Sequence, residues 1–214
     1  MSSTEFKTLI PLFAPLLTVF LGLIAIPFIE NFKNYWERKR LLKALIEELK
    51  DEILIINNEF TDLFSCYMKA VERKNGERKT NFQLIVPASI VLFSEDKLLN
   101  NHFQNLDPNV RQSLKNIKAL IEPLNIVAGK LHDQYHEALL STSKDNTDLQ
   151  ILIDLMNGYL CNVLKLRYTM CYLIDLLLKN PSNLKIHHQV DFDECIRVQL
   201  EEMKKENYYN FLRS

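Results

Sequence analysis

The stretch TLIPLFAPLLTVFLGLIAIPFI, residues 8–29, decides the organisation of this chain because it contains no charged residue. As a helix it would extend about 33 Å, which matches the ~30 Å hydrocarbon core of a bilayer. A cleaved signal peptide usually has a shorter apolar region followed by small residues, whereas this run ends in Pro27, Phe28 and Ile29. A buried core helix would need protein on every side. The run therefore predicts a retained single-pass transmembrane helix.

The residues that flank this run predict its orientation, because positively charged flanks tend to stay in the cytoplasm. Lys7 precedes the run, and the cations that follow it are Lys33, Arg38, Lys39, Arg40 and Lys43. We expect a cell (inner) membrane protein with its tail and span in residues 1–30 and a cytoplasmic domain in residues 31–214. The residues expected at the membrane interface are Tyr35, Trp36, Arg38, Lys39 and Arg40.

Small residues recur every four positions within the run, at Ala14, Thr18 and Gly22. Such spacing lets two membrane helices approach closely, so we expect this face to support self-association. The alternative is chance, since these residue types are common in membrane helices. The span contains no charged residue that could serve a proton relay or an ion pathway.

Three runs of apolar residues in steps of three and four predict three long helices after the span. The first comprises Leu42, Ile46, Leu49, Ile53, Ile56, Phe60, Leu63 and Tyr67. The second comprises Val110, Leu114, Ile117, Ile121, Leu124, Ala128, Leu131, Tyr135 and Ala138. The third comprises Leu149, Leu152, Met156, Tyr159, Val163, Leu166, Met170, Leu173 and Leu177. The coiled-coil-like spacing predicts an all-α fold, in which the span continues into an antiparallel, up-and-down helical bundle.

The ends of these helices are marked by turn and capping residues. We expect the first helix to end near Asn75-Gly76, the second to begin with Asp107-Pro108, and the third to stop at Asn180-Pro181. Pro123 is expected to kink the second helix. Residues 82–93 could form buried helical turns or an extended segment. Ser94 is expected to cap a short helix, and residues 193–212 to form a terminal amphipathic helix.

The composition excludes several classes of protein. The chain has 214 residues, with 26 Lys plus Arg against 27 Asp plus Glu, so no global field attracts nucleic acid and no direct nucleic-acid partner is expected. Its glycines are Gly22, Gly76, Gly129 and Gly158. They lie too far apart for the phosphate-binding loop of a P-loop NTPase, a Rossmann domain or a kinase. Scarce glycine also argues against a β-sandwich or barrel.

His132 and His136 form the sharpest chemical motif, in the sequence HDQYH. Two histidines four residues apart share one helical face and could bind a metal ion, with Asp133 where zinc proteases carry a glutamate. Aspartate is shorter and would hold a water less well. A third ligand would have to come from His187, His188 or Asp191. The alternative is that both histidines are ordinary polar residues at the edge of the apolar seam.

The remaining reactive and charged residues have structural interpretations beside functional ones. Cys66, Cys161, Cys171 and Cys195 show no C-x-x-C spacing, and Cys161 and Cys171, within the third helical run, are expected to be small buried residues. Asp191, Asp193 and Glu194 are expected to cap the last helix. Lys69, Arg73, Lys74, Arg78 and Lys79 form a basic cluster that is either a solvated loop or a contact site for a small anionic, phosphate-bearing ligand or an acidic partner.

The layout of one amino-terminal span, a basic flank and a helical domain is similar to that of small bacterial membrane effectors, including antiviral ones whose helical domains resemble HEPN ribonucleases. The R-x4-6-H signature of those nucleases is absent, because no histidine follows Arg111 or Arg167 at the required distance. We therefore expect a non-enzymatic protein that acts through self-assembly or partner binding at the lipid bilayer. The alternatives are a membrane-tethered, metal-dependent hydrolase using His132 and His136, and a sensor of a small anionic ligand.

Overall fold

The computed structural model describes residues 3–76, 83–140, 147–179 and 191–212, without the side chains of residues 3–17, 24 and 139–140. Within these ranges the chain is helical, with turns and one extended segment but no strand, so the all-α prediction is confirmed. The α-helices are α1 (Ser3–Lys74), α2 (Phe93–Asn101), α3 (Pro108–Leu140), α4 (Thr147–Leu177), α6 (Phe192–Glu202) and α7 (Tyr209–Leu212). The chain divides into two compact units, Met1–Lys43 and Ala44–Ser214.

Helix α1 contains both the predicted span and the first predicted long helix without interruption. It ends where the sequence predicts. The amide of Asn75 donates to the carbonyl of Val71 at 3.0 Å, and Gly76 follows with a φ of 77°. Glycine adopts this left-handed conformation without a steric penalty from a Cβ atom, which makes it a common helix terminator.

Apolar side chains between Thr18 and Trp36 of α1 are exposed rather than packed. The exposed residues are Val19, Phe20, Leu21, Leu23, Ile26, Phe28, Ile29, Phe32, Tyr35 and Trp36. Among the residues that the structure describes, none of the helices combines the length and the apolarity that crossing a membrane would require. The predicted span of residues 8–29 is not supported by that finding.

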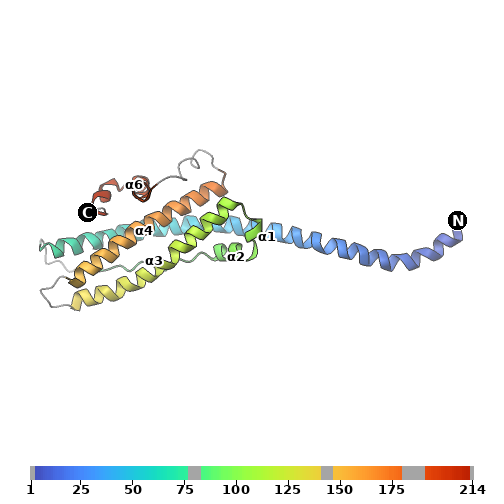
Figure 1. Cartoon of the computed structure of the whole chain (residues 1–214), viewed down its shortest axis with the longest axis horizontal. Helices are drawn as coiled ribbons and strands as arrows, with labels where there is room; N and C mark the ends of the chain where they lie inside the picture. The colour runs from blue at the N-terminus through green and yellow to red at the C-terminus, as the bar shows by residue number, and fades with distance from the viewer. Residues whose placement is uncertain (1–2, 77–82, 141–146, 180–190, 213–214) are drawn as a thin grey trace. The chain divides into compact units, whose positions relative to one another are not determined.

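Helix α4 runs antiparallel to both α3 and the second half of α1 (Figure 1). At one end of the bundle, Lys74 of α1 donates to Gln150 of α4, and Gln134 of α3 donates to the carbonyl of Asp148 at 3.5 Å. The ends of α1 and α3 therefore both lie beside the start of α4, so α1 and α3 are parallel. The up-and-down prediction is wrong for this pair, because the chain returns along the bundle before α3 begins and only short connections force antiparallel neighbours.

The core lies between α1, α3, α4 and α6, and α4 contributes the largest share of it. The fully buried leucines of α4 are Leu152, Leu160, Leu164, Leu166 and Leu173. The predicted seams of α3 and α4 are largely buried, but that of α1 shifts by one residue at its start. Leu41 and Leu45 are buried there, whereas Leu42 and Ile46 are only half-buried. Leu41 with Leu45, and Leu42 with Ile46, are both at helical spacing from Leu49, so the periodicity of the sequence did not show which pair is buried.

The returning segment, residues 83–92, is extended and is held by side chains instead of a neighbouring strand. The amide of Ala88 donates to the carboxylate of Glu59 at 3.0 Å. Asn125 of α3 accepts from the amide of Ile90 at 2.9 Å and donates to its carbonyl at 3.0 Å. Buried main-chain groups need such partners, and here α1 and α3 both supply them.

The start of α2 differs from the prediction. The N-cap position is Leu92, not Ser94, and its side chain makes no capping hydrogen bond. Glu48 of α1 instead accepts from the Ser94 amide at 3.0 Å and from the Ser94 hydroxyl at 2.7 Å. A carboxylate at this place satisfies free amides and complements the positive end of the helix dipole.

The carboxy-terminal tail is several short helices instead of the single helix that was predicted. Asp191 caps α6, accepting from the amide of Glu194 at 2.8 Å, so the capping interpretation of this acidic cluster is confirmed for Asp191. Helix α6 ends at Glu202, and Lys204 follows with a φ of 58°. This turn leads into the 3-10 helix Glu206–Tyr208 and then α7.

Candidate functional site: a polar cavity between α3, α4 and α6

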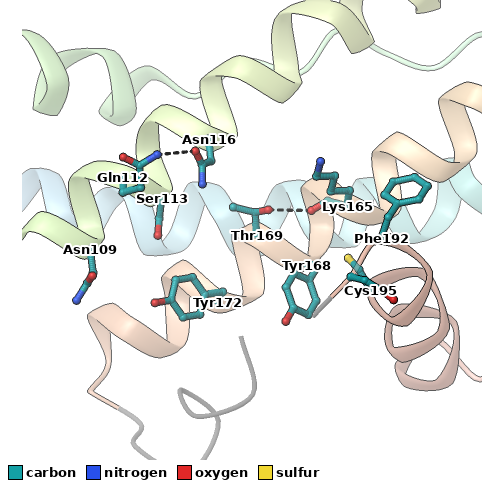
Figure 2. Close-up of a pocket in the computed structure, with 11 residues that line it drawn as sticks. Asn109, Gln112, Ser113, Asn116, Lys165, Tyr168, Thr169, Tyr172, Phe192 and Cys195 are labelled. Carbon is teal, nitrogen blue, oxygen red and sulfur yellow. Dashed lines mark hydrogen bonds between the residues drawn. The ribbon is translucent and has the colours of Figure 1, made fainter. Parts of the chain in front are cut away.

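A polar cavity of about 380 Å³ opens between the first turns of α3, the second half of α4 and the start of α6. Figure 2 shows the side chains that surround it. Its lining residues are Asn109, Gln112, Ser113, Asn116, Lys165, Tyr168, Thr169, Tyr172, Asp191, Phe192 and Cys195. A cavity of a few hundred Å³ that gathers several polar groups is typical of small-molecule sites.

Helix α3 supplies a row of carboxamides. Asn109, Gln112 and Asn116 are spaced by three and four residues, so they lie on one face beside the buried seam that begins at Val110. The Nε2 of Gln112 donates to the Oδ1 of Asn116 at 2.9 Å, which fixes the two amides relative to each other (Figure 2). Ser113, only 4% exposed, lies deeper in the same wall. This wall can both donate and accept hydrogen bonds.

Helix α4 supplies an amine and hydroxyl groups at Lys165, Tyr168, Thr169 and Tyr172. Thr169 already donates its hydroxyl to the carbonyl of Lys165 at 2.9 Å, leaving its oxygen as an acceptor. Burial raises the pKa of Tyr168 to about 12, so its phenol stays neutral over the physiological range. The Nζ of Lys165 lies 5.8 Å from the ring centroid of Phe192 on α6, where it can reach an anionic group.

Cys195 of α6 lies in a setting that favours the neutral thiol over the thiolate. Burial raises the pKa of its thiol to about 12, and the opposing effect of Lys165 is smaller. The thiolate is the reactive form of cysteine, and it is therefore suppressed. Among the described residues that line the cavity there is no histidine and one carboxylate, that of Asp191, which already caps α6. The lining offers hydrogen-bond donors and acceptors for the reversible binding of a polar molecule.

Arg167, next to Tyr168, joins the helices that support the cavity. Its Nε donates to Oδ1 of Asn57 on α1 at 2.9 Å, and its Nη1 donates to the carboxylate of Glu202 at 2.7 Å and to Gln199. Arg167 and Gln199 are 7% and 1% exposed. A planar guanidinium can hold several acceptors at once, so this residue fixes α6 against α1 and α4.

Comparison with protein-family models, characterised proteins and solved structures finds no match for this chain. Its function must therefore be inferred from its own residues.

The structure places the two motif histidines together on the exposed surface of α3. The Nε2 atoms of His132 and His136 lie 3.3 Å apart, and Asp133 lies 3.5 Å from Nδ1 of His132. Within the described residues, no group of three or more metal-binding side chains gathers around them. Of the proposed third ligands, Asp191 caps α6, and His187 and His188 lie outside the described residues. Metal binding by this pair stays a prediction.

The basic cluster is described only in part. Lys69, Arg73 and Lys74 lie in the last two turns of α1, and Lys74 donates to Gln150. Arg78 and Lys79 lie outside the described residues. An anionic-ligand site at this end of the bundle therefore stays a prediction.

The residues predicted to lie at a membrane interface are grouped on α1. Tyr35 and Trp36 are about half exposed, and their ring centroids are 6.1 Å apart. Arg38 and Lys39 lie over these two rings, at 5.7 Å and 5.4 Å from the respective centroids. Arg40 is exposed one residue further along.

The predicted oligomerisation face is described at Thr18 and Gly22, which lie one turn apart on α1. Ala14 falls among the residues whose side chains are outside the description. A Cβ atom added at Gly22 would meet nothing within 4 Å, so the surface at this glycine is open.

Sequence reasoning missed the polar cavity. The signal that could have pointed to it is the carboxamide row of α3, because asparagine and glutamine at helical spacing next to an apolar seam form a continuous polar face. No pattern in the sequence shows that this face meets Lys165, Tyr168 and Phe192. That arrangement depends on how α3, α4 and α6 pack.

Proposed function

We propose that this chain is a non-enzymatic, membrane-anchored helical protein whose bundle acts by self-assembly or by binding a partner. The observation that carries this proposal is the apolar surface of α1, where Val19, Phe20, Leu23 and Phe28 are 62–77% exposed. Such a patch is costly in water and is typical of a surface that contacts lipid or another protein. The uncharged run of residues 8–29, 22 residues long in the sequence, favours lipid.

The group of aromatic and basic residues after this run supports the same proposal. Tyr35 and Trp36, with Arg38 and Lys39 over their rings, have the chemistry that favours the boundary between acyl chains and anionic headgroups. With the cations on this side, the bundle lies in the cytoplasm and the protein in the cell membrane. Pairing of spans through Thr18 and Gly22 would bring bundles together, with membrane perturbation or recruitment as the output, as in a bacterial antiviral effector.

Flotation with lipid vesicles tests the anchor. We expect the full-length protein to float with phosphatidylcholine and phosphatidylglycerol vesicles and to resist alkaline carbonate extraction. Val19→Arg with Phe20→Arg should keep it at the bottom of the gradient, because two arginines near the centre of a span cost about 6 kcal/mol together.

The matched control is Leu54→Arg with Ile55→Arg, two exposed apolar residues of α1 within the second unit. This variant should float like the wild type. A wild-type protein that stays at the bottom, or that carbonate releases, would refute the anchor. In the floating vesicles, Gly22→Ile should reduce crosslinked oligomers, and an unchanged pattern would remove the proposed assembly face.

The polar cavity favours a second function, sensing of a small anionic ligand. Carboxamides such as Asn109 and Asn116 can pair with the hydrogen-bonding edge of a nucleobase, Phe192 can stack on its plane, and Lys165 can bind a phosphate. AMP is a suitable probe because it carries all three features.

Thermal unfolding with and without millimolar AMP tests this second function. We expect AMP to raise the Tm of the wild type, because a ligand that binds only the folded state stabilises it. Lys165→Met should abolish the rise. Lys115→Met is the matched control, since Lys115 is an exposed lysine of α3 outside the cavity lining. A Tm rise that survives in Lys165→Met, or no rise in the wild type, would contradict this role.

A further inference from the structure

A second cavity, of about 610 Å³, lies between the end of the extended segment, α2 and the middle of α3. Its apolar lining comes from Ile90, Val91, Leu92, Ile121 and Ile126, and its polar lining from Glu95, Asp96, Lys118, Glu122 and Asn125. With three carboxylates against one amine, its formal charge is −2 when all four groups are ionised. The polar cavity shares no residue with it.

Glu95 is the unusual group in this cavity. The residue is 4% exposed, and its Oε1 is buried without a hydrogen-bond partner in the described structure. The single cation of the lining, Lys118, donates to Asp96. A buried carboxylate without a partner is costly, and a ligand that supplies a cationic donor recovers that cost.

We propose that this cavity binds a small organic ammonium ion with an apolar body, whose charged group pairs with Glu95. The isoleucines Ile90, Ile121 and Ile126 cover the hydrocarbon part of the ligand. The volume lies within the range of small-molecule sites. An organic cation suits the lining because its hydrocarbon part can contact these isoleucines, which offer a metal ion no oxygen ligand.

The charge state of Glu95 makes this binding depend on pH. Burial raises the pKa of its carboxyl most strongly, Lys118 lowers it and Asp96 raises it, and together these effects place the pKa at about 7. The other charged groups nearby are Glu122 on α3 and Glu48 on α1, which is bonded to Ser94 next to Glu95. The ionised form binds the ammonium. Affinity is therefore close to full at about pH 8 and falls as the pH drops through the folded-state pKa of about 7.

Methyl NMR of the full-length protein, labelled at isoleucine δ1 methyls, tests the proposal with hexylammonium as the probe. At about pH 8 we expect saturable shifts at Ile90, Ile121 and Ile126, none at the exposed Ile151, and none with hexanol, since burial of an unpaired charge drives the binding. The affinity should fall about tenfold by pH 6, as a carboxyl of pKa about 7 becomes protonated.

Glu95→Gln keeps the shape of the side chain and should weaken hexylammonium binding by at least about tenfold and remove its pH dependence. Glu122→Gln is the matched control, because it removes one charge from the same lining and should change the affinity much less. Three results would overturn the proposal: equal losses in the two variants, hexanol binding as tightly as hexylammonium, or saturation of the same methyls by Mg²⁺. If Glu95→Gln does not fold, the pH dependence of the wild type still decides.

Discussion

Arg167→Met is expected to destabilise the bundle by about 3 kcal/mol, because it leaves buried acceptors without their donor. Gln199 is 1% exposed, and its side-chain oxygen accepts a hydrogen bond from Arg167. Asn57 on α1 accepts a second hydrogen bond from the same guanidinium. Because Gln199 is buried, its amide oxygen loses a hydrogen bond in a low dielectric when the guanidinium is removed. The measurement is thermal unfolding followed by circular dichroism, with a fall in Tm of about 6–12 °C for a chain of this size.

A double variant separates the cost of unpaired polar groups from simple loss of packing. Arg167→Met with Gln199→Leu removes both buried partners, so it should be more stable than Arg167→Met alone. Arg197 is the matched control, since it is an exposed arginine of α6 that pairs with Glu194 and Glu201. Arg197→Met should leave the Tm nearly unchanged because surface ion pairs contribute little. A small effect of Arg167→Met would show that the buried network does not hold α6 in place.

Phe60→Ala is expected to cost about 4 kcal/mol, because it opens a cavity beside two stacked rings of a buried aromatic cluster. Phe60 is 2% exposed, and its ring stacks with those of Phe64 and Tyr208, with centroids 6.2 Å and 6.4 Å away. Phe64 and Tyr208 in turn stack at 3.8 Å. The loss should appear as a lower midpoint in urea with an unchanged m-value.

The matched control for Phe60 is Phe93, at the start of α2, which is 71% exposed. Phe93→Ala removes the same atoms from solvent-exposed surface and should change the free energy of unfolding by less than about 0.5 kcal/mol. If Phe60→Ala and Phe93→Ala were equally stable, the stacking of Phe60 and Phe64 on Tyr208 would not be what holds the carboxy-terminal turns against α1. Proteolysis that removes the tail of Phe60→Ala, but not of Phe93→Ala, would support that joining role.

The sequence was enough to predict the helices, because their buried residues recur at helical spacing. Val110, Leu114 and Ile117 of α3 were all placed correctly on the buried face. The direction of the helices was not predictable in the same way. A long connection lets α1 and α3 run parallel, and the apolar run of residues 82–93 was consistent with either helical turns or an extended segment.

The residues missed by sequence reasoning are those whose partners are distant along the chain. Ser94 looks like a capping residue on its own, whereas in the structure Glu48, 46 positions away, caps the helix. Glu95 and Arg167 resemble ordinary surface charges in the sequence, yet both are buried. The two histidines were placed correctly on one face because their spacing alone sets it, whereas the polar cavity depends on the packing of three helices.

The hydrogen bonds that Glu59 and Asn125 make to residues 83–92 should also reduce aggregation. Ile85 and Val91 of this segment are exposed, and the sequence around them is rich in β-branched residues and free of charge from Phe82 to Ser94. The part after Pro87, residues 88–94, contains no proline, and a segment of this kind readily pairs with a copy of itself into intermolecular cross-β structure when its amides are free. Glu59 and Asn125 accept hydrogen bonds from the amides of Ala88 and Ile90. Those two amides are therefore not free to pair with another copy of the chain, so the native fold protects this segment from fibril formation.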